Sequence, residues 1–141
     1  MQRNIYQLSR EAAGYTQEKA AELIGISVES LRSYELDKRI PQDKSVIKMI
    51  EIYDARYLAY QHLKTSAEVG QKFMPEVNLT DISKAILKLQ KEVNDFLKLK
   101  DDLLDITCDG VISEDEKPRW ETILKELDDI TNAIMSVKFA K

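Results

Sequence analysis

The side chains best suited to contact a nucleic acid gather in one short stretch of the chain. Between Ser27 and Ser33 the sequence reads SVESLRS, which mixes hydroxyl, carboxylate and guanidinium groups with single apolar residues. The methyl groups of Val28 suit a thymine methyl, the carboxylate of Glu29 can accept from a cytosine amino group, and Arg32 can donate to guanine or to a phosphate. This stretch therefore has the chemistry to read base edges in a groove.

Two short helices joined by a tight turn must position this stretch. The pattern of residues 17–36 predicts one helix that ends at Gly25 and a second that begins after Ser27. A steep crossing of two helices needs a small side chain at the contact, which Ala21 supplies, and a turn residue that tolerates positive φ, which Gly25 supplies. These spacings indicate a helix-turn-helix unit, whose apolar anchors are Ile24, Ile26, Leu31 and Tyr34.

Further short motifs flank this unit. They are Arg10, Thr16-Gln17, Gly25-Ile26-Ser27, Tyr34-Glu35 and Lys38-Arg39-x-Pro41. Together they resemble the Cro/repressor-type (XRE) family of bacterial and phage transcription regulators, over roughly residues 3–60. The resemblance implies a compact five-helix bundle whose third helix, the recognition helix, lies in the DNA major groove.

The resemblance also implies a structural ion pair between Arg10 and Glu35. Such a pair would tie the first helix to the recognition helix, since either charge alone would be costly in an apolar frame. Asp37 departs from the family, which often has glycine where the recognition helix ends. Aspartate adopts the left-handed turn less readily than glycine, so this turn is disfavoured but not excluded.

Candidate DNA contacts follow from the outward positions of these elements. The N-terminal residues of a recognition helix reach base edges first, so Val28, Glu29 and Ser33 are expected to contact bases. Gln17, at the N-terminus of the preceding helix, is expected to hold a phosphate. Lys38 and Arg39, just past the recognition helix, would bind the DNA backbone. The full expected set is Gln17, Ser27, Val28, Glu29, Ser30, Arg32, Ser33, Lys38, Arg39 and Lys44.

The helical periodicity of the whole chain predicts an all-α protein. We expect a five-helix DNA-binding domain over residues 1–68, a linker over residues 69–79 and an antiparallel helical hairpin over residues 80–141. Apolar residues repeat in a 4–3 rhythm along residues 82–103 and 120–137, which is typical of coiled-coil seams. Seams this narrow leave apolar surface uncovered, so the hairpin would either form a homodimer or pack on the front domain.

The charge is divided unevenly between the two parts. Residues 1–66 carry ten basic and nine acidic residues, whereas residues 67–141 carry eleven basic and sixteen acidic ones. The leading interpretation is a sequence-specific regulator of transcription, a repressor, that binds double-stranded DNA as a homodimer. The alternative is a DNA-binding antitoxin or phage switch protein whose acidic C-terminal hairpin binds a partner protein.

Other function classes find little support in the composition. The chain has one histidine and one cysteine, Cys108, which argues against a zinc site and excludes an internal disulfide. It lacks a glycine-rich phosphate loop and a nucleophile–base motif, so no enzyme activity and no cofactor are expected. No segment is apolar enough to span a membrane or to act as a signal peptide, and a cytoplasmic location is expected.

One loop matches the spacing of a calcium site. Residues 105–116, DITCDGVISEDE, place Asp105, Thr107, Asp109 and Glu116 where an EF-hand-like loop has ligands. A simpler interpretation is the turn of the hairpin, with Asp109-Gly110 as the turn and Ser113 and Glu116 as a capping box. We take the turn as the default and expect no metal.

Overall fold

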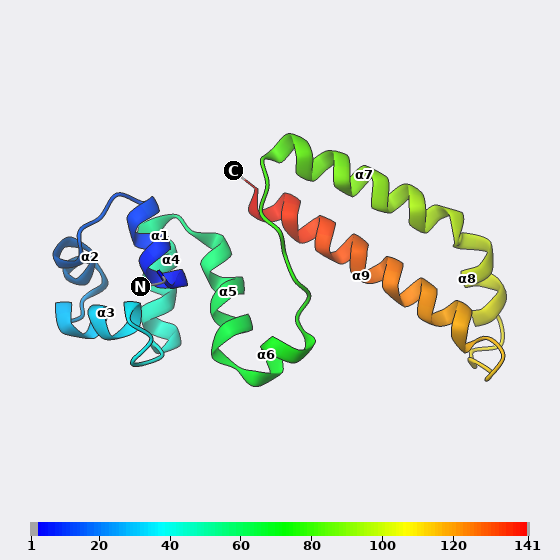
Figure 1. Ribbon diagram of the computed structural model, residues 1–141, viewed down its shortest axis with the longest axis horizontal. Coiled ribbons are helices and arrows are strands. Elements are labelled where there is room, and N and C mark those ends of the chain that lie inside the picture. Colours follow the sequence, from blue (N-terminus) through cyan, green and yellow to red (C-terminus); the bar gives the residue numbers. More distant parts are fainter. Residues whose placement is uncertain (1–2, 141) are drawn as a thin grey trace. The chain divides into compact units, whose positions relative to one another are not determined.

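The predicted all-α fold is confirmed. The computed structural model describes residues 3–140, and every regular element in that range is a helix (Figure 1). The chain divides into two compact units between Met74 and Pro75. The first unit contains α1 (Ile5–Ala12), α2 (Gln17–Ile24), α3 (Val28–Glu35), α4 (Asp43–Tyr53), α5 (Arg56–Ser66) and α6 (Glu68–Phe73). The second contains α7 (Ile82–Lys98), α8 (Lys100–Thr107) and α9 (Lys117–Phe139).

Hydroxyl side chains cap the N-termini of α2 and α3 in the first unit. The hydroxyl of Thr16 accepts from the N–H of Lys19 and caps α2, and the hydroxyl of Ser27 accepts from the N–H of Ser30 and caps α3. These bonds satisfy N–H groups that have no partner within the helix. The cap therefore fixes the residue at which α3 begins, Val28.

One apolar core holds α1 to α5 together. It is built from one face of each helix, as the helical periodicity predicts. Leu31 of α3 and Met49 of α4 are fully buried in it, and Tyr6 of α1 closes one side. The other buried members are Ala20, Ala21, Ile24, Tyr34, Val46, Tyr53 and Leu58.

Helix α6 occupies the first part of the segment that was expected to be a linker. It packs against α5 and belongs to the first unit. Gly70, within the expected linker, is buried, and a Cβ atom there would collide with the backbone carbonyl of Leu63 in α5. The glycine therefore permits a close helix–helix approach instead of interrupting a helix.

The second unit is an antiparallel hairpin in which α7 and α9 lie side by side (Figure 1). The first expected seam is not one continuous helix, because the backbone leaves helical geometry at Leu99, and α8 follows. The last helix begins at Lys117 with Pro118 in its first turn, where proline needs no N–H partner.

The buried seam of this hairpin differs from the predicted one at some positions. Ala85 and Glu92 of α7 and Ala133 of α9 are buried, whereas Ile86 and Ile134 are almost half exposed. The 4–3 pattern of large residues suggested that these isoleucines lie between the helices. Small residues take their places in the contact and let the two helix axes approach closely, whereas Ile123 of the predicted seam is 1% exposed.

The loop between α8 and α9 forms a turn. Asp109 accepts a hydrogen bond from the N–H of Val111, and Glu116 accepts from both the N–H and the hydroxyl of Ser113. Asp105 faces Arg119 at 3.3 Å. The carboxylates of the candidate calcium loop therefore have separate partners and do not converge on one point. In residues 3–140, the one group of at least three carboxylates with oxygens within 4.8 Å of one another is Glu92, Glu126 and Asp129.

Candidate nucleic-acid interface

The turn between α2 and α3 sets the angle of the recognition helix. Gly25 ends α2 with φ +80°, a conformation that favours glycine. Ala21 is 1% exposed where the two helices meet, as expected for a close crossing. Lys48 of α4 donates to the carbonyl of Ile24 at 2.9 Å and so caps the C-terminus of α2 from another helix. Sequence analysis missed this lysine because it has no local pattern that distinguishes it from a surface residue.

Arg10 and Glu35 meet inside the first unit. Arg10 Nε lies 2.6 Å from Glu35 Oε1 and Arg10 Nη2 lies 3.0 Å from Glu35 Oε2, a two-pronged pairing. The residues are 7% and 3% exposed. Arg10 also donates to the carbonyl of Tyr15 at 2.7 Å, and its hydrogen bond to Glu35 raises the pKa of Arg10. The pair anchors the end of α3 to α1.

Gln17 extends this pair to the surface. Its Nε2 donates to Glu35 at 2.7 Å, and its Oε1 accepts from Arg32 Nε at 3.1 Å. Arg32 also lies 3.8 Å from Glu18 and 4.0 Å from Glu29. The amide of Gln17, which was expected to hold a phosphate, thus has two partners within the chain. Its bond to Arg32 orients this candidate base-reading side chain.

The outer face of α3 presents the expected base-reading residues. Glu29 has a side chain that is 82% exposed, and that of Arg32 is 49% exposed. Val28 is different, because it is half-buried and packs partly against the core. Ser27 is exposed but caps the helix. Ser30 and Ser33 are half-buried at the edges of the same face.

The turn after α3 carries the residues that are expected to contact the DNA backbone. Asp37 adopts the left-handed conformation, with φ +56°, and its carboxylate accepts from Asn4 Nδ2 at 2.8 Å. Asn4 also donates to the carbonyl of Tyr34 at 2.6 Å, so α1 holds the turn in place. Beyond it, Lys38 is exposed, and Arg39 lies over the ring of Tyr34, 5.9 Å from its centre. Lys44, in the first turn of α4, is exposed as well.

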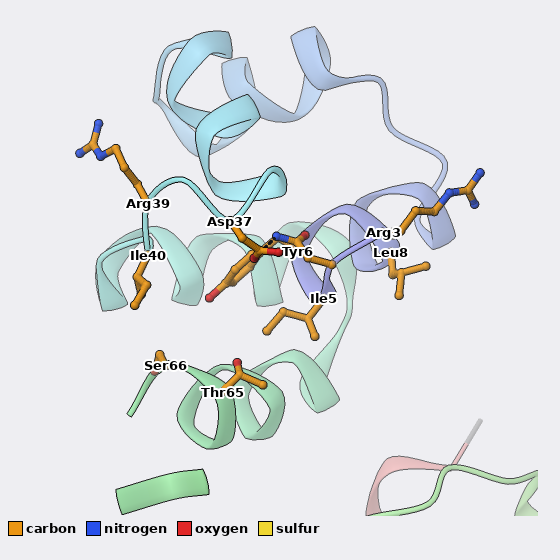
Figure 2. A pocket seen from close by; sticks show the side chains of 10 residues that line it. Arg3, Ile5, Tyr6, Leu8, Asp37, Arg39, Ile40, Thr65 and Ser66 are labelled. Atoms are coloured by element: carbon orange, nitrogen blue, oxygen red, sulfur yellow. Dashed lines mark hydrogen bonds between the residues drawn. The ribbon is translucent and has the colours of Figure 1, made fainter. Parts of the chain in front are cut away.

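A pocket of about 440 Å³ lies beside this turn, between the start of α1 and the end of α5 (Figure 2). Asp37 and Tyr6 border it, and the guanidinium groups of Arg3 and Arg39 point outward on opposite sides. The Tyr6 hydroxyl is hydrogen-bonded to His62 Nδ1 at 2.8 Å, and burial, followed by the charge of Asp37, raises the pKa of Tyr6 to about 12. The polar groups here hold α1, α3 and α5 together.

None of the helices in residues 3–140 combines the length and the apolar content needed to cross a membrane.

Comparison with known proteins identifies the first unit. The helix-turn-helix family matches residues 8–60. The chain is also 33% identical over 84 residues to a protein named HTH-type transcriptional regulator ImmR from Bacillus subtilis (strain 168). That alignment covers 60% of this chain and 64% of the relative, slightly less than two thirds of its length. No solved structure matches the chain significantly. Over residues 8–60, which include α2 and α3, the chain is thus similar to the helix-turn-helix family.

Proposed function

We propose that this protein is a sequence-specific regulator of transcription that binds double-stranded DNA through α3. The observation that carries the proposal is the geometry of α3 within a helix-turn-helix domain. One face of α3 is anchored by Leu31 and by the Arg10–Glu35 pair, and the opposite face presents Glu29 and Arg32 to solvent. A helix held in this way can enter the major groove without losing its own packing.

In this proposal the residues of α3 make different contacts with the DNA. Glu29, in the first turn, accepts from a cytosine amino group, and Val28 contacts a thymine methyl group. Arg32 is held by Gln17 and donates to guanine or to a nearby phosphate. Ser30 and Ser33 complete the base-reading edge.

The flanking groups fix the register on the DNA backbone. Lys38 and Arg39 follow the turn that Asn4 and Asp37 hold, so their positions relative to α3 are set by hydrogen bonds. Gln17 lies at the N-terminus of α2, where a phosphate is favoured, although its amide also bonds to Glu35. Contacts of this kind raise affinity for any sequence and orient the reading helix.

We propose that the regulatory outcome is repression. A protein that occupies a site overlapping a promoter excludes the polymerase by its bulk alone. A DNA-reading unit such as the first unit is sufficient for that task. A reporter gene placed downstream of a DNA site that the protein binds should therefore be expressed more weakly when the protein is present, and stronger expression would contradict repression.

Replacing Lys38 with alanine should weaken binding to all DNA sequences by a similar factor. One fewer phosphate contact makes the negative slope of log K against log salt concentration less steep by about one unit. Fluorescence anisotropy with labelled duplexes over a range of salt concentrations measures that slope. Lys88→Ala, on the second unit, is the matched control and should leave the slope unchanged. Equal slopes for the wild type and Lys38→Ala would show that this turn does not contact the backbone.

A further inference from the structure

The guanidinium of Arg32 has an acceptor near each of its three nitrogens. Its Nε donates to Gln17 Oε1 at 3.1 Å, its Nη2 lies 3.8 Å from Glu18 Oε1, and its Nη1 lies 4.0 Å from Glu29 Oε2. Gln17 and Glu18 begin α2, and Glu29 lies in the first turn of α3. The acceptors therefore come from both helices of the helix-turn-helix unit.

These three acceptors differ in how firmly they are held. Gln17 is fixed from inside the unit, because its Nε2 donates to the buried carboxylate of Glu35 at 2.7 Å. The side chains of Glu18 and Glu29 are 68% and 82% exposed, and ion pairs between exposed groups are weak and screened by salt. Gln17 thus sets where Arg32 lies, whereas either carboxylate can be exchanged for another acceptor.

The guanidinium keeps donors for a further ligand in this arrangement. An arginine side chain has one N–H on Nε and two on each terminal nitrogen. With one donor directed at each acceptor, one N–H remains on Nη1 and one on Nη2 of Arg32. Guanine presents two neutral acceptors in the major groove, O6 and N7, and takes a pair of arginine donors. Arg32 can therefore bind guanine while its three partners keep their places.

A phosphate is a different ligand for this group because it is charged. A phosphate that bound the terminal nitrogens of Arg32 would lie next to the carboxylates of Glu18 and Glu29, and juxtaposed like charges repel. To bind it favourably, Arg32 must leave at least one carboxylate, which then faces the DNA backbone. Two carboxylates and one guanidinium sum to a net negative charge here, so this part of the surface has no excess positive charge for a phosphate.

We infer that Glu18 is a specificity-determining residue, which directs Arg32 to a guanine base and keeps it from phosphates. Glu18 acts through Arg32 as a positioning residue, and it lies outside the set of expected DNA contacts. This inference rests on the proposed function, because it needs α3 to lie in the major groove. Binding to unrelated DNA depends on phosphate contacts, so a residue that suppresses one of them raises the preference of the protein for its own site.

The neighbouring Glu22 shows how an ordinary carboxylate of α2 is placed. It is 70% exposed, lies one helical turn beyond Glu18 and pairs with Lys19 at 3.1 Å. Glu18 also lies in the first turn of α2, where the helix dipole favours an acid. If Glu18 only stabilised the helix, loss of its charge would change binding to all DNA alike, as loss of the Glu22 charge should.

The test compares the full-length Glu18→Gln and Glu22→Gln variants, whose helix content is checked by circular dichroism. Anisotropy over a range of salt concentrations measures binding to a duplex selected from a random pool and to an unrelated duplex. In Glu18→Gln, affinity for the unrelated duplex should rise by about tenfold at about 0.1 M salt, and the negative slope of log K against log salt concentration should steepen by about one unit. Affinity for the selected duplex should rise much less, so the preference for it falls. Glu22→Gln, the matched control, should change both affinities by the same factor.

Removal of Arg32 shows whether Glu18 acts through it. In an Arg32→Ala background, Glu18→Gln should change both affinities by the same factor, as Glu22→Gln does. An unchanged or greater preference in Glu18→Gln, or the same loss of preference with and without Arg32, would overturn the inference. A wild type that binds no duplex would overturn the proposed function as well, whereas a selected duplex that Glu18→Gln binds with unchanged preference would leave the proposed function standing.

Discussion

Replacing Arg10 with methionine is expected to lower the free energy of unfolding of the first unit by about 3–5 kcal/mol. The change leaves the Glu35 carboxylate, which is 3% exposed, without the cation that neutralises it. Gln17 still donates one hydrogen bond to that carboxylate, but an amide carries no compensating charge. Urea denaturation followed through the amide resonances of α1 to α5 measures this unit separately from the hairpin.

A double-mutant cycle shows whether the loss arises from the pair. Glu35→Gln should also destabilise the unit, and the double variant should lose less than the sum of the two single losses. Arg3→Met is the matched control, because Arg3 pairs with Glu11 at 3.0 Å with 62% of its side chain exposed. Exposed pairs contribute about 0–1 kcal/mol, so this variant should stay near the wild type. Single losses that simply add would contradict a coupled pair.

Replacing Leu31 with alanine is expected to lower the stability of the first unit by about 2–5 kcal/mol. Leu31 is 0% exposed and is the main apolar anchor of α3 in the core. Its loss leaves a cavity below the recognition helix and loosens its position, so binding to DNA should weaken as well. The same urea experiment measures the stability, and anisotropy measures the binding.

Leu36→Ala is the matched control for this change. Leu36 follows the last residue of α3 and is 42% exposed, so removal of its side chain creates no closed cavity. The expected loss is well below that of Leu31→Ala. Equal losses at the two positions would mean that Leu31 does not anchor α3 in solution.

The sequence was sufficient to predict the features that depend on local pattern. Thr16 and Ser27 are capping residues and Gly25 is a turn residue, and each acts within a few positions of the chain. Leu31 and Tyr34 follow the helical period, so their burial could be predicted from spacing. The Arg10–Glu35 pair came from the family resemblance, because no periodic signal relates residues 25 positions apart.

The features that were missed depend on contacts between distant polar residues or on backbone proximity. Asn4 holds the turn after α3, and Lys48 caps α2, yet each has the composition of an ordinary surface residue. Gly70 looked like a break because glycine usually ends a helix, whereas here it allows α6 to approach α5. In the hairpin, Ile86 and Ile134 were placed at a helix contact that Ala85 and Ala133 occupy, since periodicity alone does not say which of two adjacent residues is inside.

Selection of bound sequences from a random pool of duplex DNA tests the central claim most directly. The wild type should enrich an inverted repeat whose half-site centres lie about 10 base pairs apart or a multiple of that distance. Glu29→Ala should enrich the same repeat with one position relaxed in each half-site, a loss of about 1–3 kcal/mol of discrimination there. A pool that shows no enriched sequence, or a Glu29→Ala variant with unchanged preference at every position, would contradict the account of α3 as the reading helix.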